Sequence, residues 1–190
     1  MTVETLIQKA QERLAQKAYR EAHTLCMEVL KRAPTNPEAF YLLAVLTADH
    51  DNHRKAVELF DRALAAQPDH AAALAQKARS LIALNERDLA LEAANQAAKT
   101  PSLDAYTLDT LGVVFTRAGR HTEAIDYYQR AVASAPERAD YLYNYGAALQ
   151  FVGRLDEARS AYRRAIERNS SDARSYAGIV TITKQTETDN

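Results

Sequence analysis

The sequence predicts an all-α fold, a solenoid of five helical hairpins followed by one terminal helix. Apolar residues recur at helical spacing, and the same pattern returns with a period of 34 residues along nearly the whole chain. We expect a single array over residues 3–184, with a polar tail at 185–190. Its repeats are 3–36, 37–70, 71–104, 105–138 and 139–172, and its terminal helix is 173–184.

The fourth repeat defines the pattern most clearly. One face of its first predicted helix carries residues at spacings of three, four and seven: Leu108, Leu111, Gly112 and Phe115. Gly119 marks the turn to the second helix, and Pro136 ends that helix. The pattern therefore predicts two amphipathic helices joined by a short turn.

One column of the second helix is occupied by alanine in all five repeats. Its members are Ala22, Ala56, Ala90, Ala124 and Ala158. Two helices approach closely only where side chains are small, and larger residues then interdigitate around that contact. We expect this column to be the packing contact of every hairpin.

The turns and the linkers also follow the period. Gly119 and Gly153 occupy the turn inside a repeat, and Asp51 and Asn85 share their column. These residue types tolerate the left-handed backbone conformation best. The third repeat differs, because its second helix is rich in alanine and its proline, Pro101, comes one residue early. We expect a thin layer there and a change of stacking before Ala105.

These residues resemble the tetratricopeptide repeat family. The fourth repeat matches the family pattern in order, with Leu108, Leu111, Gly112, Phe115, Ala124, Tyr128, Ala131 and Pro136. The fifth repeat matches it with Leu142, Gly146, Leu149, Ala158, Tyr162 and Ala165. We expect the hairpins to wind into a right-handed superhelix with an aromatic-lined inner face. The resemblance implies that the first helix of each repeat lines this face.

The resemblance also implies a scaffold that binds a peptide or a partner segment in its groove. The candidate groove residues are Tyr41, Arg79, Tyr106, Asp109, Arg117, Tyr143, Asn144, Gln150, Phe151 and Arg174. Aromatic side chains bury large areas, and arginines recognise carboxylates. In the alternative interpretation, Arg79 and Asp109 pair with each other and the tyrosines wedge between repeats.

Some members of the family bind the C-terminal carboxylate of chaperones through a lysine, asparagine and arginine clamp. Asn144 and Arg174 match two of these positions, but Asp109 stands where the lysine is required. We therefore do not expect a chaperone clamp.

The composition restricts the classes of partner. The formal net charge is -1, with 26% charged residues, so bulk charge attracts neither nucleic acid nor an anionic membrane. No apolar run has the length of a membrane span, and residues 1–17 lack the apolar core of a signal peptide. Cys26 is the single cysteine and excludes an internal disulfide. We expect a cytoplasmic protein.

Chemistry-bearing residues are sparse. The segment from Asp49 to His53 could hold a metal ion, but it is better interpreted as the solvated turn of the second repeat. Cys26 occupies the aromatic packing column, which favours a buried structural thiol over a nucleophile. The sequence contains no Gly-rich phosphate loop and no nucleophile elbow. We expect no catalytic residue, no metal and no cofactor.

Two function classes remain open. The first is an interaction scaffold without chemistry of its own. The second is the N-terminal repeat region of a larger bacterial enzyme, because residues 183–190 resemble the segment that follows the repeats in proteins fusing this fold to a sulfotransferase domain. In that case the catalytic domain would lie beyond Asn190.

The residues of the terminal helix predict an apolar outer surface at the end of the array, which would bind another protein surface. Tyr176, Ile179 and Val180 are expected to pack back onto the fifth repeat, with Ile182 just off that face. Arg174 and Lys184 are the only charges from residue 173 to residue 184. The end unit of a soluble solenoid needs a polar outer face. We therefore expect this helix either to continue into further chain or to form a homodimer with a second copy.

Overall fold

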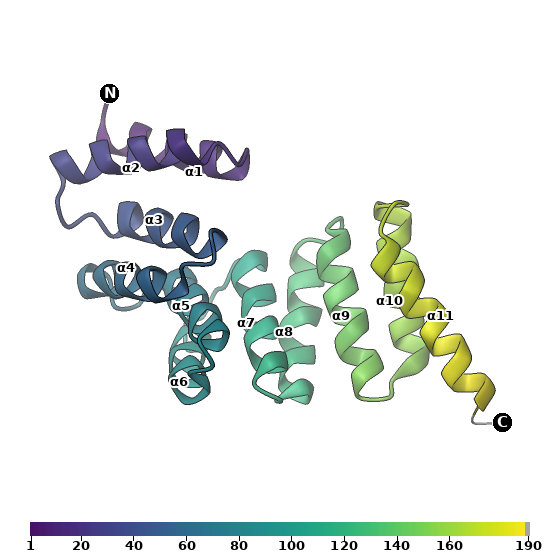
Figure 1. Ribbon diagram of the computed structural model, residues 1–190. Coiled ribbons are helices and arrows are strands. Elements are labelled where there is room, and N and C mark those ends of the chain that lie inside the picture. The colour runs from purple at the N-terminus through teal and green to yellow at the C-terminus, as the bar shows by residue number, and fades with distance from the viewer. Residues whose placement is uncertain (189–190) are drawn as a thin grey trace. The chain divides into compact units, whose positions relative to one another are not determined.

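The computed structural model describes residues 1–188, with side chains through Lys184, and this range contains eleven α-helices (Figure 1). The first helices of the hairpins are α1 (Val3–Ala15), α3 (Pro37–Asp49), α5 (Ala71–Ala83), α7 (Ala105–Arg117) and α9 (Ala139–Phe151). The second helices are α2 (Tyr19–Arg32), α4 (His53–Ala66), α6 (Arg87–Ala98), α8 (His121–Ser134) and α10 (Leu155–Arg168). The terminal helix is α11 (Ala173–Thr188). The predicted all-α fold of five hairpins and a terminal helix is confirmed.

The helices pack into two compact units. Unit 1, Met1–Pro101, contains α1–α6, and unit 2, Ser102–Asn190, contains α7–α11. Within each unit the two helices of a hairpin contact each other, and each second helix contacts the first helix that follows it. The division between the units falls at the early proline of the third repeat. α6, which precedes it, buries mainly alanine, as expected for a thin layer.

The alanine column is buried in every hairpin. The exposed fraction is 2% at Ala22 and 0% at Ala56, Ala90, Ala124 and Ala158. Because no solvent-accessible space remains around these methyl groups, a larger side chain at this position would overpack the hairpin. The packing role predicted for this column is confirmed.

The turns inside the hairpins use the left-handed conformation that the sequence predicts. The backbone angle φ is 75° at Gly119 and 81° at Gly153, and it is 59° at Asp51 and 62° at Asn85. Lys17 takes the same conformation in the first repeat, with φ at 58°, although lysine gives no signal for it. The turn geometry is therefore imposed by hairpin packing and not by the residue type alone.

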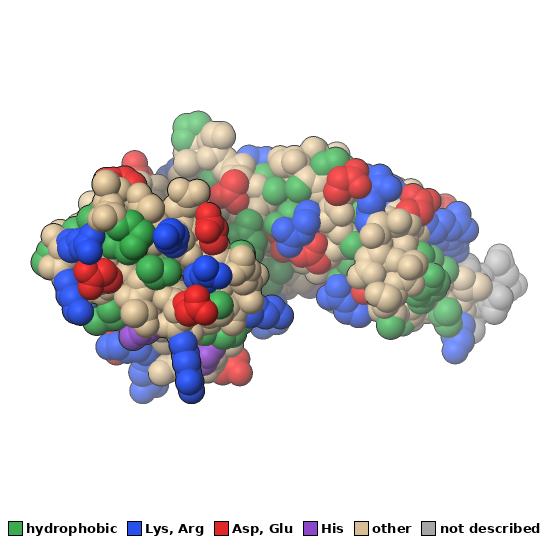
Figure 2. All heavy atoms as spheres, turned by 90° about the horizontal axis from the view of Figure 1, so that it is seen from above, with side chains coloured by type: hydrophobic (Ala, Val, Ile, Leu, Met, Phe, Trp, Pro, Cys, Tyr) green, Lys and Arg blue, Asp and Glu red, His purple; other side chains and the backbone are tan. Residues whose placement is uncertain are grey.

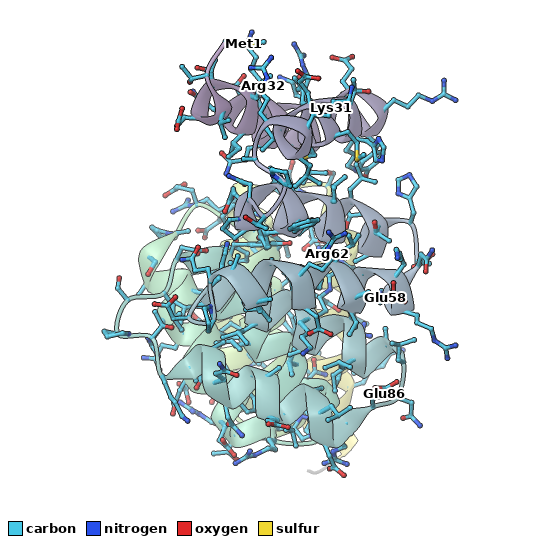
Figure 3. The ribbon with its side chains drawn as sticks, turned by 90° about the vertical axis from the view of Figure 1, so that its left-hand side faces the viewer. Met1, Lys31, Arg32, Glu58, Arg62 and Glu86 are labelled. Atoms are coloured by element: carbon cyan, nitrogen blue, oxygen red, sulfur yellow. The ribbon has the colours of Figure 1, made fainter. Side chains whose placement is uncertain are left out.

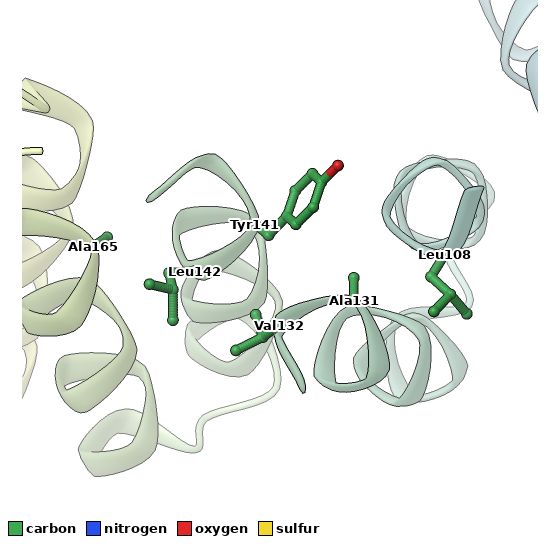
Figure 4. Close-up of a cluster of buried hydrophobic side chains, with 6 residues drawn as sticks. All are labelled: Leu108, Ala131, Val132, Tyr141, Leu142 and Ala165. Atoms are coloured by element: carbon green, nitrogen blue, oxygen red, sulfur yellow. The ribbon is translucent and has the colours of Figure 1, made fainter. Parts of the chain in front are cut away.

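The core of unit 2 is a continuous layer between its hairpins. Figure 4 shows six buried residues that connect α7, α8, α9 and α10: Leu108, Ala131, Val132, Tyr141, Leu142 and Ala165. Val132 of α8 and Leu142 of α9 place branched side chains between successive repeats. This packing fixes α9 in position for the site described below.

The terminal helix packs through a different face from the one expected. Of the three residues predicted to face inward, Ile179 is half-buried, but Tyr176 and Val180 have exposed fractions of 48% and 54%, whereas Ser175 and Ile182 are fully buried. The reason lies at Gly178, where a Cβ atom would come within 2.5 Å of Cε2 of Tyr162. The missing side chain lets α11 approach α10 along the stripe through Gly178, which turns Tyr176 and Val180 outward.

The ends of α11 can also be compared with the prediction. The helix begins at Ala173, as expected, and the carboxylate of Asp172 accepts a hydrogen bond from the Ser175 hydroxyl at 2.7 Å. It continues to Thr188, past the expected end at Lys184. Residues 189 and 190 of the predicted polar tail lie outside the described residues.

Candidate functional site

A groove in unit 2 lies between α9 and α11, above the aromatic ring of Tyr162, which belongs to α10. Its volume is about 630 Å³. Its lining residues, which define the α9–α11 groove, are Tyr143, Ala147, Gln150, Phe151, Tyr162, Arg174, Ala177, Gly178 and Thr181. The small side chains of Ala147 and Ala177 and the absence of one at Gly178 leave open space between the two helices, above the Tyr162 ring, which is itself only 2% exposed.

The floor of the groove is the ring of Tyr162. The ring lies between two glycines, because a Cβ atom on Gly146 of α9 would come within 2.8 Å of it and one on Gly178 of α11 within 2.5 Å. The phenol hydroxyl donates a hydrogen bond to Oε1 of Gln150 at 2.8 Å. Burial raises the pKa of Tyr162 to about 12, so the hydroxyl keeps its proton and remains a donor. Gln150 is thereby oriented, and its Nε2 amide group is left to donate to a ligand.

Arg174, Tyr143 and Phe151 form the walls. The guanidinium of Arg174 lies 4.3 Å from the ring centre of Tyr143, and its Nε donates to Oδ1 of Asp172 at 3.0 Å. The Arg174 side chain is 57% exposed, so its terminal N–H groups can reach a ligand. Phe151 is 68% exposed and stacks on His121 with ring centres 3.6 Å apart. This arrangement can bind an apolar side chain next to a carboxylate.

Four of the predicted groove residues meet in this groove, namely Tyr143, Gln150, Phe151 and Arg174. Two others, Asp109 of α7 and Asn144 of α9, contact each other: the Asn144 amide donates to Oδ1 of Asp109 at 2.9 Å. That bond ties successive first helices together.

The other predicted groove residues of unit 2 lie on α7. Tyr106 is 40% exposed and Arg117 is exposed, and neither lines the α9–α11 groove. The sequence did not single out Tyr162 as a groove residue, because its column is typical of hairpin packing. Gly146 and Gly178 at either side of its ring are the signal that could have found it.

Unit 1 holds the remaining two predicted residues. Arg79 of α5 is exposed, and Tyr41 of α3 is half-buried beside the ring of His70, with ring centres 5.0 Å apart. Glu38 completes a polar cluster there, because its carboxylate accepts from His70 Nε2 at 3.2 Å and from the Gln11 amide at 2.9 Å.

The Glu38 cluster links three elements. The backbone N–H of Ala73 donates to Nδ1 of His70 at 3.4 Å, so the imidazole caps α5 while its Nε2 proton points to Glu38. The bond from His70 holds the pKa of Glu38 below its ordinary value, against the opposing effect of burial. Gln11 belongs to α1 and Glu38 to α3, so the cluster ties consecutive first helices in unit 1.

The other candidate chemistry has structural roles. Asn52 caps α4 by accepting from the N–H of Lys55 at 3.3 Å, and Asp51 forms the turn before it. Among the side chains that the structure describes, which extend to Lys184, no three from His, Cys, Asp or Glu lie close enough to hold a metal ion. Cys26 is 1% exposed, and burial raises the pKa of its thiol to about 11, so it packs as an apolar residue.

The surface carries charges of both signs. Figure 2 shows acidic and basic side chains interspersed on the face it presents, in keeping with the net charge of -1. Across the helices described here, none combines the length and apolar character needed to cross a membrane.

Comparison with known proteins points to one family. The family model of the N-terminal TPR repeats region of Psidin matches residues 45–159, and a tetratricopeptide repeat model matches residues 7–71. The mouse BBSome complex member BBS4 is 28% identical over 153 residues, which cover 78% of this chain and 29% of that protein. Human mitochondrial import receptor subunit TOM70 is 26% identical over 121 residues, covering 62% of this chain and 20% of that protein. The chain thus spans less than a third of each of these relatives.

Solved structures share the fold at low sequence identity. TTC0263, a TPR protein of Thermus thermophilus, superimposes with a TM-score of 0.77 at 21% identity, covering 96% of this chain and 99% of that one. Pseudomonas aeruginosa pilF gives a TM-score of 0.79 at 18% identity, with coverages of 97% and 84%. These similarities concern the arrangement of helical hairpins.

Proposed function

Because the chain belongs to the tetratricopeptide repeat family, we propose that it is an interaction scaffold that holds a segment of a partner protein in the α9–α11 groove. The observation that carries the proposal is the guanidinium of Arg174 over the ring of Tyr143, beside the aromatic floor of Tyr162. In this proposal the protein uses no cofactor and no catalytic residue, binds neither nucleic acid nor a membrane, and acts in the cytoplasm.

The chemistry of the groove selects the segment. Phe151 and the half-buried Tyr143 offer aromatic surface for an apolar side chain, and the Nε2 amide of Gln150 offers donors for a peptide carbonyl. Arg174 offers its terminal N–H groups to a carboxylate, either an acidic side chain or a chain end. The favoured ligand is therefore a peptide with an apolar residue next to an acidic one.

A selection experiment tests this role. The protein is used to select binders from a displayed library of random peptides, and partners are also recovered from the native host by pull-down. We expect the double variant Tyr143→Ala with Phe151→Ala to weaken the selected peptides by about tenfold or more, because aromatic anchors carry much of the free energy of binding.

The matched control is Met27→Ala, which removes an exposed apolar side chain of α2 that does not line the groove. Circular dichroism verifies that both variants keep their helices. Equal recovery of every partner by wild type and the double variant would move the binding site away from this groove.

A homodimer through α11 is a second proposal, favoured by one observation. Tyr176 and Val180 lie one helical turn apart on the outer face of α11, and about half of each side chain is exposed. Light scattering on the wild type and on Val180→Glu tests it. A wild-type dimer that the variant converts to a monomer supports the proposal, and a monomeric wild type at high concentration contradicts it.

The alternative of a longer enzyme concerns sequence beyond this chain. No sulfotransferase is among the matched proteins described above. The proposal of a fusion to a sulfotransferase domain therefore depends on the resemblance of residues 183–190 alone. Sequencing the reading frame past Asn190 decides it, since a stop codon there excludes the fusion.

A further inference from the structure

Unit 1 carries a second groove, on the layer formed by its second helices. It lies between α4 and α6 with α5 as its floor, and its volume is about 410 Å³. Its lining residues, which define the α4–α6 groove, are Val57, Asp61, Leu64, Pro68, Leu74, Lys77, Leu81, Glu86, Leu89, Glu92, Ala93 and Gln96. The Gln96 amide donates to the carbonyl of Pro68 at 3.3 Å and bridges the two walls.

An exposed leucine stands at the rim of this groove. Leu89 is 52% exposed, above the buried side chains of Leu74 and Leu81 in the floor. The same column of the second helix is charged in every other repeat, with Glu21, Lys55, Glu123 and Glu157. A single exposed leucine is common in proteins, but one that replaces a charge beside an apolar hollow indicates an interaction surface.

The hollow itself comes from a small side chain. Ala93 of α6 lines the groove, and its column holds Leu25, Leu59 and Tyr127 in three other repeats and Ala161 in the fifth. The methyl group of Ala93 leaves open the space that a leucine or tyrosine would fill. The alanine-rich α6 thus produces a cavity on this face of unit 1.

The charges around the hollow are mostly acidic. Its lining contains three carboxylates, Asp61, Glu86 and Glu92, and one ammonium group, that of Lys77. Lys77 is already paired, because its Nζ lies 2.6 Å from Oδ1 of Asp61. Among the described side chains, no ion pair engages Glu86 or Glu92, and both are exposed. Figure 3 shows Glu86 near the start of α6, with Glu58 and Arg62 on α4.

Unit 2 does not repeat this charge pattern. The column of Glu86 holds Arg120 and Arg154 there, and each arginine pairs with a glutamate one turn later, Glu123 or Glu157. The acidic rim therefore belongs to the α4–α6 groove and is not a general feature of the repeats.

We propose that the α4–α6 groove docks a cationic amphipathic helix of a partner protein. A leucine-sized side chain of that helix enters the hollow beside Leu89 and Ala93, and lysines or arginines on its flanks meet Glu86 and Glu92. The charge complementarity selects this ligand over an acidic one, which the two carboxylates would repel. The groove lies in unit 1, so the proposal is independent of binding in the α9–α11 groove.

A synthetic peptide tests the proposal directly. The probe is an amphipathic helical peptide with leucines along one face and lysines on both flanks, and its counterpart carries glutamates in place of the lysines. Fluorescence anisotropy measures binding of each labelled peptide. We expect the lysine peptide to bind the wild type and the glutamate peptide not to bind. The double variant Glu86→Lys with Glu92→Lys should weaken the lysine peptide by about tenfold or more.

Two matched variants separate the groove from general attraction. Asp126→Lys with Glu167→Lys changes the net charge equally on exposed positions of unit 2 and should leave the affinity within about twofold. Leu89→Ala should weaken binding without any change of charge.

Several results would overturn the proposal. The first is that the lysine peptide does not bind the wild type. The second is that both peptides bind with equal affinity. The third is that the two double charge variants lose affinity for the lysine peptide to the same extent. A loss caused by Tyr143→Ala with Phe151→Ala would also overturn it, because the probe would then occupy the α9–α11 groove.

Discussion

The two units build the same hairpin with different side chains at one contact. In unit 1, the first helices carry Ala10, Ala44 and Ala78 at the position where unit 2 has glycine. The second helices of unit 1 carry Cys26, Phe60 and Ala94 at the position where unit 2 has tyrosine. In unit 2, Gly112 and Gly146 meet the rings of Tyr128 and Tyr162, and a Cβ atom on Gly112 would come within 2.5 Å of Tyr128. Glycine on one helix therefore accompanies tyrosine on the other.

This difference explains why the aromatic groove lies in unit 2. Glycine inside a helix costs about 1 kcal/mol relative to alanine, but burial of a large side chain contributes about 1.5–3 kcal/mol. The tyrosines also gain fixed hydroxyl partners, since Tyr162 donates to Gln150 and Tyr128 lies 3.3 Å from the Thr116 hydroxyl. Cys26, Phe60 and Ala94 have no hydroxyl to orient a neighbour. The glycine–tyrosine pair thus shapes both the core and the groove floor.

The largest expected effect on stability comes from removing the Tyr162 ring, which lies between Gly146 and Gly178. Tyr162→Ala should lower the free energy of unfolding by about 3–5 kcal/mol, because it leaves a cavity between α9 and α11 that no backbone can fill. Urea denaturation followed by circular dichroism measures this. Met27→Ala on an exposed position of α2 is the control and should change stability by about 0.5 kcal/mol or less. Equal losses in both variants would contradict the packing described for Tyr162.

A smaller effect tests the glycine side of the same pair. Gly112→Ala should destabilise unit 2 by about 1–3 kcal/mol, since the added methyl group meets the Tyr128 ring and this overpacking outweighs the gain in helix propensity. Thermal and urea unfolding measure the difference.

The reciprocal change in unit 1 sharpens the comparison. Ala78→Gly should cost about 1–2 kcal/mol, from the lower helix propensity of glycine and the loss of a fully buried methyl group, because Ala94 in the facing column has no ring that could use the space. If Gly112→Ala stabilised the protein instead, the close approach of α7 and α8 would not depend on glycine.

Much of the fold follows from the sequence because its signals are local and repeated. The alanine column, the turn residues and the prolines each recur in register, so hairpin boundaries could be placed before the structure was known. The orientation of α11 could not be predicted in this way. A helix with apolar residues on two sides leaves its packing face open, and Gly178, which has no side chain, decides the face through its contact with Tyr162.

The candidate site was only partly predictable for a related reason. The family resemblance implies which residues face the groove, and four of the residues so named, Tyr143, Gln150, Phe151 and Arg174, line one hollow in the structure. It does not reveal which polar residues satisfy one another. Asp109 and Asn144, for example, form a hydrogen bond between two helices. The α4–α6 groove arises because Ala93 is smaller than the leucine or tyrosine at the same position of other repeats, and a search for chemistry-bearing residues overlooks an alanine.

The polar clusters of the two units predict a difference in acid sensitivity. The pKa of Glu38 is lowered in the folded state, so its ionised form contributes stability at pH values above 4.5, its ordinary pKa, and this contribution is lost as the pH falls through the folded pKa. Glu38→Gln should therefore cost about 1 kcal/mol near neutral pH and little in acid. Urea midpoints measured over a pH series report this difference.

Asp140 of unit 2 is the matched control. The hydrogen bond from Arg138 also lowers the pKa of Asp140, but its side chain is 46% exposed, so solvent screens the pair. Asp140→Asn should shift the acid midpoint less than Glu38→Gln does. The opposite ranking would show that the Glu38 cluster does not hold α1 and α3 together.

The smallest expected effect lies in the turns, where the units differ again. Unit 1 places Lys17, Asp51 and Asn85 in the left-handed conformation, whereas unit 2 places Gly119 and Gly153 there. A left-handed lysine is strained by about 1–2 kcal/mol, and glycine removes that strain while adding about 0.5–1 kcal/mol of backbone entropy to the unfolded chain. Lys17→Gly should therefore stabilise unit 1 by about 0.5 kcal/mol, and Gly119→Lys should destabilise unit 2 by a similar amount. Thermal melts of the two variants and of Lys31→Gly, a helical surface control that should only lose stability, measure these shifts. A destabilised Lys17→Gly would mean that the lysine side chain contributes more to the first hairpin than its backbone strain costs.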